Sequence, residues 1–409
     1  MDRLSRRKML IAGGTLGALG ALGMASPALA RTPWTWSPGG SVAGVGAGAD
    51  PNWVWDDEAD ALMAAVIDRG DVPRVNPLLR TWTRNDQPLP DGLPADLRDF
   101  MERARRLPAW AEQGKLDAAA AFNVSRGFYL NLLNGLGGGM LSTAIPREAR
   151  AVYYSKGGAD MEDRVAKTSR LGFAVGERNA YRPEGTLVVE AVKTRLVHAA
   201  VRHLLPQSPG WKQTSGGQAI PISLADMLVT WHTLPTYAMR KMLEWDVPIG
   251  SADSAGYLHV WQVTAHMLGI RDEYIPATWD AANAQSKQLL DPVLGPTPEG
   301  VVLTDILLGQ LAEQTSPGSI SRPLVDALAR YLVGDRIADW DGIDREPLWE
   351  ATIRSAWPKL VAFRESLIPL PLVPQIAWTI DEAVRRYIMF FLTKGQEVHI
   401  EIPDANRPS

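Results

Sequence analysis

Apolar residues recur at every third or fourth position along most of this 409-residue chain. This spacing places the apolar side chains of a segment on one face of an α-helix, and that face must be buried against other helices. Strand-like alternation appears only briefly, at residues 397–402. The sequence therefore predicts an all-α fold. Helices are predicted at residues 56–67, 95–107, 115–136, 184–205, 223–245, 260–270, 298–314, 322–340 and 381–395.

Residues 1–30 have the features of an export signal. Arg6 and Arg7 precede an apolar, glycine-rich run that ends at the small-residue site Ala28-Leu29-Ala30. The paired arginines indicate the twin-arginine route, although an ordinary secretory signal is the alternative. The run is too short and too interrupted by glycine to predict a stable membrane anchor. Because clients of the twin-arginine route cross the membrane folded, we expect a secreted protein that carries a cofactor inserted before export.

The chain contains no cysteine, although it is predicted to leave the cell. Disulfides are therefore impossible. Thiolate-bound iron–sulfur clusters, thiolate-ligated haem and covalently attached haem are excluded for the same reason. A metal would have to be held by His, Asp, Glu, Tyr, Lys or a main-chain oxygen.

The remaining sequence predicts one domain. Residues 31–52 are rich in proline and glycine and are expected to form an exposed lead, and no linker divides residues 53–409. The 42 Lys and Arg residues against 46 Asp and Glu residues give a net charge of −4. This balance predicts neither nucleic-acid binding nor docking on anionic lipid, so the expected partner is neutral or apolar.

The predicted helix at 184–205 carries one histidine between two arginines. His198 lies about 60° from Arg195 and about 40° from Arg202 around the helix, so all three project from one face. An imidazole there could coordinate the iron of a haem while the guanidinium groups reach its propionates. The alternative is that both arginines pair with carboxylates of neighbouring helices and that His198 only forms a hydrogen bond.

A second group of candidate residues lies upstream of this helix. Arg164, Lys167 and Thr168 have the spacing of one helix face, and Glu148 follows a proline at the start of another predicted helix. In an apolar pocket a neutral lysine amine can ligate iron, and a glutamate with a raised pKa can act as a general base. The alternative is a solvated helix in which these charges form surface ion pairs.

Two other features have simpler interpretations. The glycine run at 135–140 follows a helical segment and lacks nucleotide-loop spacing, so its glycines are expected to permit close approach to a ligand or a neighbouring helix. The remaining histidines are interpreted as hydrogen-bonded structural residues, because none forms a metal-binding pair four residues apart. They are His203, His232, His259, His266 and His399.

Taken together, these segments resemble the latex clearing proteins, which are secreted rubber oxygenases of actinomycetes, over essentially the whole chain. The blocks that carry the resemblance are the twin-arginine leader, NGLGGGMLSTAIPREARAVYYSKGG, RVAKTSR and TRLVHAAVRH. The wider family includes a fungal enzyme that cleaves the isoprenoid chain of a mycophenolic acid precursor. The resemblance implies a non-covalent b-type haem in a globin-like helical core with additional helices.

The resemblance also implies roles for the candidate residues. His198 would be the proximal iron ligand, and Lys167 the distal ligand in a closed form. Glu148 would be the catalytic base, with Arg164 and Thr168 shaping the distal pocket. Arg195 and Arg202 match the buried arginines of the family beside His198.

The implied reaction is cleavage of the internal double bonds of cis-1,4-polyisoprene by dioxygen. It leaves oligo-isoprenoids with one aldehyde and one ketone end, and a monomer is expected. One alternative is a haem oxygenase that acts on a smaller isoprenoid or alkene. A second is a haem-binding protein without turnover, in which Glu148 would be a structural ion-pair residue.

Overall fold

The computed structural model describes residues 36, 38–45, 48–155, 161–313, 321–370, 372–377, 379, 381 and 398–407. Helices are the only regular elements in these ranges, so the all-α prediction is confirmed; the globin-like arrangement stays a prediction. The β-bridges within these ranges are isolated ones, from Ser41 to Pro276 and from Ser155 to Asn406. The longer helices are α2 (Asp57–Asp68), α3 (Val72–Thr81), α4 (Ala95–Ala104), α5 (Gln113–Leu132), α7 (Pro146–Tyr154), α8 (Met161–Val175), α9 (Leu187–Leu204), α11 (Leu224–Trp231), α12 (Tyr237–Glu244), α13 (Ser251–Met267), α14 (Trp279–Leu289), α15 (Pro298–Glu313), α16 (Arg322–Val333) and α18 (Pro347–Leu367).

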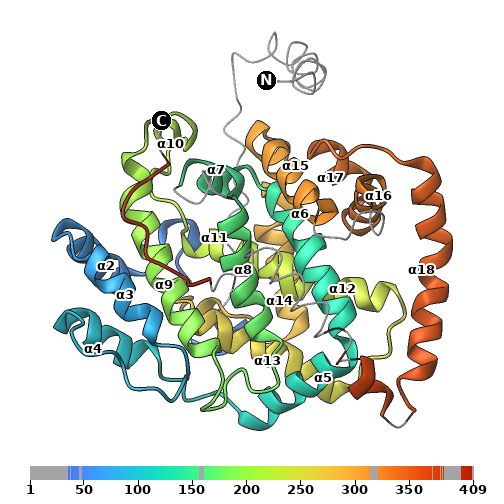
Figure 1. Cartoon of the computed structure of the whole chain (residues 1–409), viewed down its shortest axis with the longest axis horizontal. Helices are drawn as coiled ribbons and strands as arrows, with labels where there is room; N and C mark the ends of the chain where they lie inside the picture. The colour runs from blue at the N-terminus through green and yellow to red at the C-terminus, as the bar shows by residue number, and fades with distance from the viewer. Residues whose placement is uncertain are drawn as a thin grey trace.

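Helix α9 lies between two other layers of helices. It packs against α2 on one side and against α8 and α13 on the other, and α13 in turn packs along α5 (Figure 1). Its buried residues Val189, Val192 and Leu196 join the main hydrophobic core together with Met63 of α2. The apolar surface of α9 is therefore enclosed, and any polar side chain on it must find a partner inside the protein.

Two predicted helices are interrupted in the structure. A π-helical turn, His232–Thr236, containing Pro235, separates α11 from α12 within the predicted segment 223–245. Gly334 has a φ of 83° and ends α16, so the segment 322–340 forms two helices, the second being α17 (Asp335–Trp340). Apolar periodicity continues across both breaks because the core continues, whereas the backbone changes direction at the proline and the glycine.

The strand-like alternation at 397–402 does not form a strand in the residues that the structure describes there. Residues 398–402 are extended but have no neighbouring strand within the described ranges. Ile400 and Ile402 are buried, and Asn76 of α3 exchanges hydrogen bonds of 3.0 Å with both backbone groups of Ile402. The alternation thus reflects one buried side of an extended tail and not a sheet.

Two predictions concern segments near the chain termini. The twin-arginine leader and most of the helix predicted at 381–395 lie outside the described residues. Within 31–52 the lead is not uniformly exposed, because Ser41 and Pro51 are buried. No helix within the described ranges is long and apolar enough to cross a membrane.

Candidate functional site

His198 occupies the middle of α9 in an unusual environment. Its pKa is lowered to about 3, mainly by burial and also by the positive charges of Arg202 and Arg164. The residue as a whole is half-buried, but the ring is surrounded closely enough by protein that the charged form loses its stabilisation by water. Its Nδ1 atom is buried and has no hydrogen-bond partner among the described residues. His198 is therefore a neutral imidazole with an unsatisfied ring nitrogen, the state in which histidine binds a metal.

Arg195 and Arg202 attach α9 to the beginning of α2. Arg195 donates from Nε and Nη2 to the two carboxylate oxygens of Asp56 at 2.6 and 2.9 Å, and Arg202 donates from Nε to Asp60 at 2.6 Å. Burial raises the pKa of Asp60 to about 6, although Arg202 opposes the shift. Both arginines thus pair with carboxylates, which was the alternative to binding haem propionates. These two ion pairs fasten α9, the helix that carries His198, to α2.

Glu148 lies in the first turn of α7 and is also half-buried. Burial raises its pKa to about 8, and the negative charge of Asp226 adds to the shift. Thr230 of α11 donates a hydrogen bond from Oγ1 to Oε1 of Glu148 at 2.8 Å and so partly stabilises the carboxylate. A carboxyl group that titrates in this range can take up or release a proton near neutral pH.

Arg164 of α8 connects Glu148 with His198. Burial lowers the pKa of Arg164 to about 10, and the charge of Glu148 opposes that shift. The positive charge of Arg164 also lowers the pKa values of both Glu148 and His198. Helices α7, α8 and α9 therefore bring a carboxyl group, a guanidinium group and an imidazole around one interior region.

The other two candidates on α8 have different surroundings. Lys167 donates to Asp163, four residues earlier, at 2.7 Å, which is the ion pair expected if this part of α8 is solvated. Thr168 is exposed. The described structure therefore does not join Lys167 or Thr168 to Glu148, Arg164 and His198.

Thr230 and Asp226 influence Glu148 but were not predicted as site residues. Asp226 forms a capping box with Ser223 at the start of α11, and it accepts from Arg147 at 3.0 Å. Thr230 lies one turn further along α11 and 82 positions from Glu148 in sequence. The cap is visible in the sequence, but the contact across two helices is not.

Four other histidines are hydrogen-bonded as expected. His203 pairs with Asp68, His232 with Thr236 and Gln285, His259 with Gln262, and His266 with Asp272.

The glycine run allows close helix packing. A Cβ atom at Gly137 would come within 2.6 Å of Tyr237, and one at Gly138 would come within 2.9 Å of Leu234 and of the backbone of Thr233. The prediction that the run permits close approach to a neighbouring helix is confirmed for Gly137 and Gly138, whereas Gly135 and Gly139 have nothing within 4 Å of the position of a Cβ atom.

The site residues fit a haem better than a metal bound by the protein alone. No group of three or more His, Asp or Glu residues in the described part of the chain is arranged to hold a metal ion. His198 is one histidine with a buried ring nitrogen that has no partner among the described residues, and a haem needs only one such protein ligand, because the porphyrin would supply the other nitrogen ligands. The absence of cysteine agrees with non-covalent attachment.

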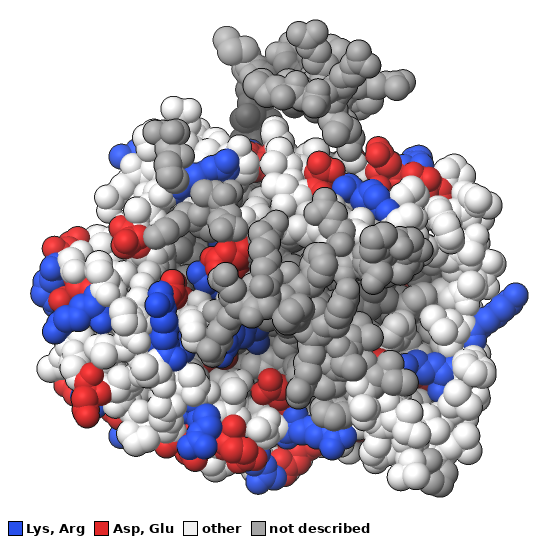
Figure 2. All heavy atoms as spheres, in the orientation of Figure 1, with Lys and Arg blue, Asp and Glu red and all other residues white. Residues whose placement is uncertain are grey.

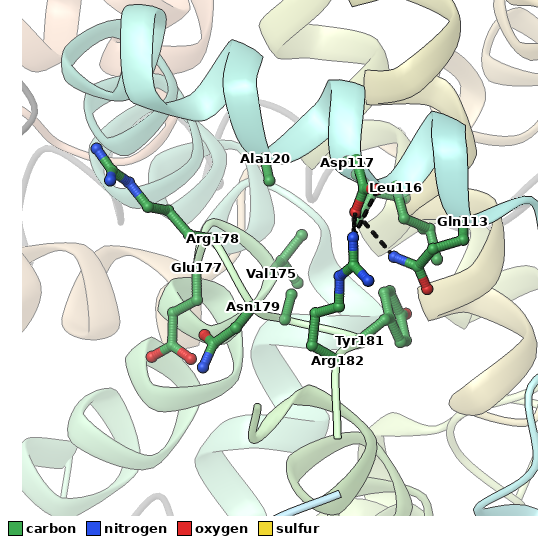
Figure 3. A pocket seen from close by; sticks show the side chains of 12 residues that line it. Gln113, Leu116, Asp117, Ala120, Val175, Glu177, Arg178, Asn179, Tyr181 and Arg182 are labelled. Atoms are coloured by element: carbon green, nitrogen blue, oxygen red, sulfur yellow. Dashed lines mark hydrogen bonds and ion pairs between the residues drawn. The ribbon is translucent and has the colours of Figure 1, made fainter. Parts of the chain in front are cut away.

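A hollow next to α5 has no comparable chemistry. It lies between α5 and the loop after α8, and its lining includes Gln113, Asp117, Val175 and Arg182 (Figure 3). Arg182 donates from Nη2 to both carboxylate oxygens of Asp117, at 2.8 and 2.7 Å. Glu148, Arg164 and His198 are not among its lining residues, so we assign it no part in the site.

The chain is similar to proteins of one oxygenase family. The model of the family described as "ER-bound oxygenase mpaB/B'/Rubber oxygenase, catalytic domain" matches residues 124–363. A rubber oxygenase of Streptomyces sp. (strain K30) is 62% identical over 409 residues, which cover 100% of both chains. A solved structure of latex clearing protein in the closed state matches with a TM-score of 0.82 and 61% identity, covering 90% of this chain and 99% of that one. Glu148, Arg164 and His198 all lie within the range matched by the family.

Proposed function

The chain belongs to the mpaB/rubber oxygenase family, and on this premise we propose that it is a haem b dioxygenase which cleaves double bonds within cis-1,4-polyisoprene. Each cleavage consumes one dioxygen and converts one C=C bond into one aldehyde and one ketone end. The observation that carries the proposal is the neutral imidazole of His198, whose buried Nδ1 has no hydrogen-bond partner among the described residues and which shares Arg164 as a charged neighbour with Glu148. The 62% identity to a rubber oxygenase over the full length of both chains supports polyisoprene as the substrate.

In this proposal His198 holds the haem as its proximal ligand. When bound, the haem supplies the activation of dioxygen. Arg195 and Arg202 keep α9 fixed against α2, which holds His198 in place. To contact a haem propionate, either arginine would have to leave its aspartate or bind the aspartate and the propionate together.

Glu148 is proposed as the base beside the substrate double bond. Its carboxylate takes an allylic proton and returns it before the products leave, so no net proton is consumed. Arg164 stabilises that carboxylate by charge, and Thr230 stabilises it by a hydrogen bond. Exclusion of water strengthens both interactions and protects reactive intermediates from side reactions. Thr168, which lies on the same helix as Arg164, would help to shape the distal pocket.

Culture fluid provides a test of both the activity and the proposed export through the twin-arginine route. Fluid from a host that expresses the full chain should convert natural latex into oligomers with carbonyl ends under air but not under nitrogen. With Arg6→Lys and Arg7→Lys together, the activity should stay inside the cells, because this route requires the arginine pair. Equal activity outside the cells for both chains would contradict the export route, and product formed under nitrogen would contradict the dioxygenase.

Lys167 is proposed as the distal haem ligand in a closed form of the protein. In the structure its ammonium group is paired with Asp163, and that pair competes with iron for the amine. Lys167→Met should remove a six-coordinate, low-spin fraction from the ferric absorption spectrum. Asp163→Asn should increase the same fraction, because the competing carboxylate is lost. Identical spectra for all three proteins would show that Lys167 does not ligate the haem.

A further inference from the structure

Helix α18 carries apolar side chains on the outside of the molecule. It lies at the edge of the fold, where Ile353, Trp357 and Val361 form its buried side and it packs against α16 and, through Trp357 and Phe128, against α5 (Figure 1). On the neighbouring side Trp349, Leu360 and Phe363 remain 37%, 41% and 64% exposed. At 100° per residue these three fall within about 60° of one another, so they form one stripe along the helix.

Three more exposed apolar residues follow the helix in the sequence. Leu370, Leu372 and Ile376 are 50%, 70% and 57% exposed. Leu372 adopts a φ of 68°, a region that leucine rarely occupies, although its side chain gains no burial there. We refer to Trp349, Leu360, Phe363, Leu370, Leu372 and Ile376 as the α18 patch.

The α18 patch is almost free of charge. No charged residue occurs between Glu365 and Asp381 in the sequence. The carboxylates of Glu350 and Glu365 lie on other sides of α18, and Glu365 pairs with Arg126 at 2.8 Å. Figure 2 shows mostly uncharged atoms along the edge of the molecule that α18 occupies, with a basic side chain projecting from it. Lys359 of α18 is exposed and lies about 40° from Phe363 around the helix, so it borders the patch.

An apolar patch of this kind requires a specific explanation. Single exposed apolar residues such as Val45 and Ile220 are common in soluble proteins, whereas a contiguous group usually marks a binding surface. A charged partner, such as an anionic lipid surface, would select several complementary charges, whereas Lys359 is a single exposed cation at the border of the α18 patch. An uncharged hydrocarbon fits this surface.

We propose that the α18 patch adsorbs the enzyme onto the surface of a hydrocarbon polymer particle. This inference rests on the proposed function, since a water-insoluble polyisoprene must be reached at an interface. Adsorption removes the exposed apolar side chains from water and keeps the enzyme at the particle between cleavage events. Because the attraction is not electrostatic, added sodium chloride should not weaken it, and sulfate should strengthen it.

The test measures adsorption separately from turnover. Full-length holoenzyme is mixed with polyisoprene particles under nitrogen, and the bound fraction is determined after centrifugation. The double variant Leu360→Ser with Phe363→Ser should adsorb about tenfold more weakly, because the exposed parts of the two side chains amount to about one buried apolar side chain. Ile220→Ser removes a similarly exposed apolar side chain outside the patch, and it should adsorb like the wild type.

Turnover and oligomeric state separate the possible outcomes. The double variant should cleave a short isoprenoid dispersed in detergent at the wild-type rate and remain the same size by light scattering. Unchanged adsorption of the double variant would show that the α18 patch does not bind the polymer, but it would leave the proposed function intact. A wild-type dimer that the double variant converts to a monomer would assign the patch to a second copy of the chain and overturn the proposal. If the wild type adsorbs but cleaves neither the polymer nor the short isoprenoid under air, the proposed function is wrong, whereas the role of the α18 patch in adsorption is retained.

Discussion

Replacing His198 by alanine should yield a folded protein that lacks the Soret absorption band of haem. The imidazole is held neutral by burial, and its buried Nδ1 atom has no hydrogen-bond partner among the described residues. Loss of the iron–nitrogen bond should weaken haem binding at least tenfold, which corresponds to about 1.4 kcal/mol. The measurement is the absorption spectrum, together with the haem content per chain after purification from a haem-replete host.

His203→Ala is the matched control for this experiment. His203 lies on the same helix, but it is paired at the surface with Asp68. Its removal should leave the spectrum unchanged. A His198→Ala protein with an undiminished Soret band would show that another residue holds the haem, and a colourless wild type that still degrades latex would exclude haem altogether.

Replacing Glu148 by glutamine should reduce turnover by about 10² to 10⁴, the usual contribution of a general base, while the haem content stays the same. Glutamine has the same shape, and its amide oxygen can still accept the hydrogen bond of Thr230. It cannot take a proton from the substrate. Oxygen uptake with latex measures the effect, and full turnover with haem intact would show that Glu148 is not the base.

Protein stability gives a control for Glu148→Gln. Folding raises the pKa of Glu148 from 4.5 to about 8. The stability that its bound proton contributes is therefore fully present below about pH 4.5 and is lost as the pH rises through about 8. Glutamine has no proton to lose, so at pH 8 the variant should unfold at the same temperature as the wild type or a higher one. A large loss of stability would mean that reduced turnover reports misfolding.

The pH profile tests the same role in another way. If the carboxylate is the active form, turnover should rise with pH and level off above about pH 8. Thr230→Val removes the hydrogen bond that lowers the pKa of Glu148, so the rise should move to higher pH while haem binding is unchanged. A profile that is the same in both proteins would indicate that Glu148 does not limit the rate.

Several features of the site were predictable because they depend on short stretches of sequence. Apolar periodicity places His198 on a buried helix, and the proline before Glu148 indicates that this glutamate lies in the first turn of α7. Helix α18 was not predicted, because its exposed stripe and its internal Pro358 obscure the pattern of one buried face.

By itself the sequence determined the helical class, the absence of thiol chemistry and the choice of His198 and Glu148 as candidates. The tertiary structure decided which partners their neighbours have. Arg195 meets Asp56 from 139 positions away and Arg202 meets Asp60 from 142, so both guanidinium groups pair with α2. Helix periodicity follows from neighbours three and four residues apart, whereas the partner of a buried charge depends on which distant helix packs against it.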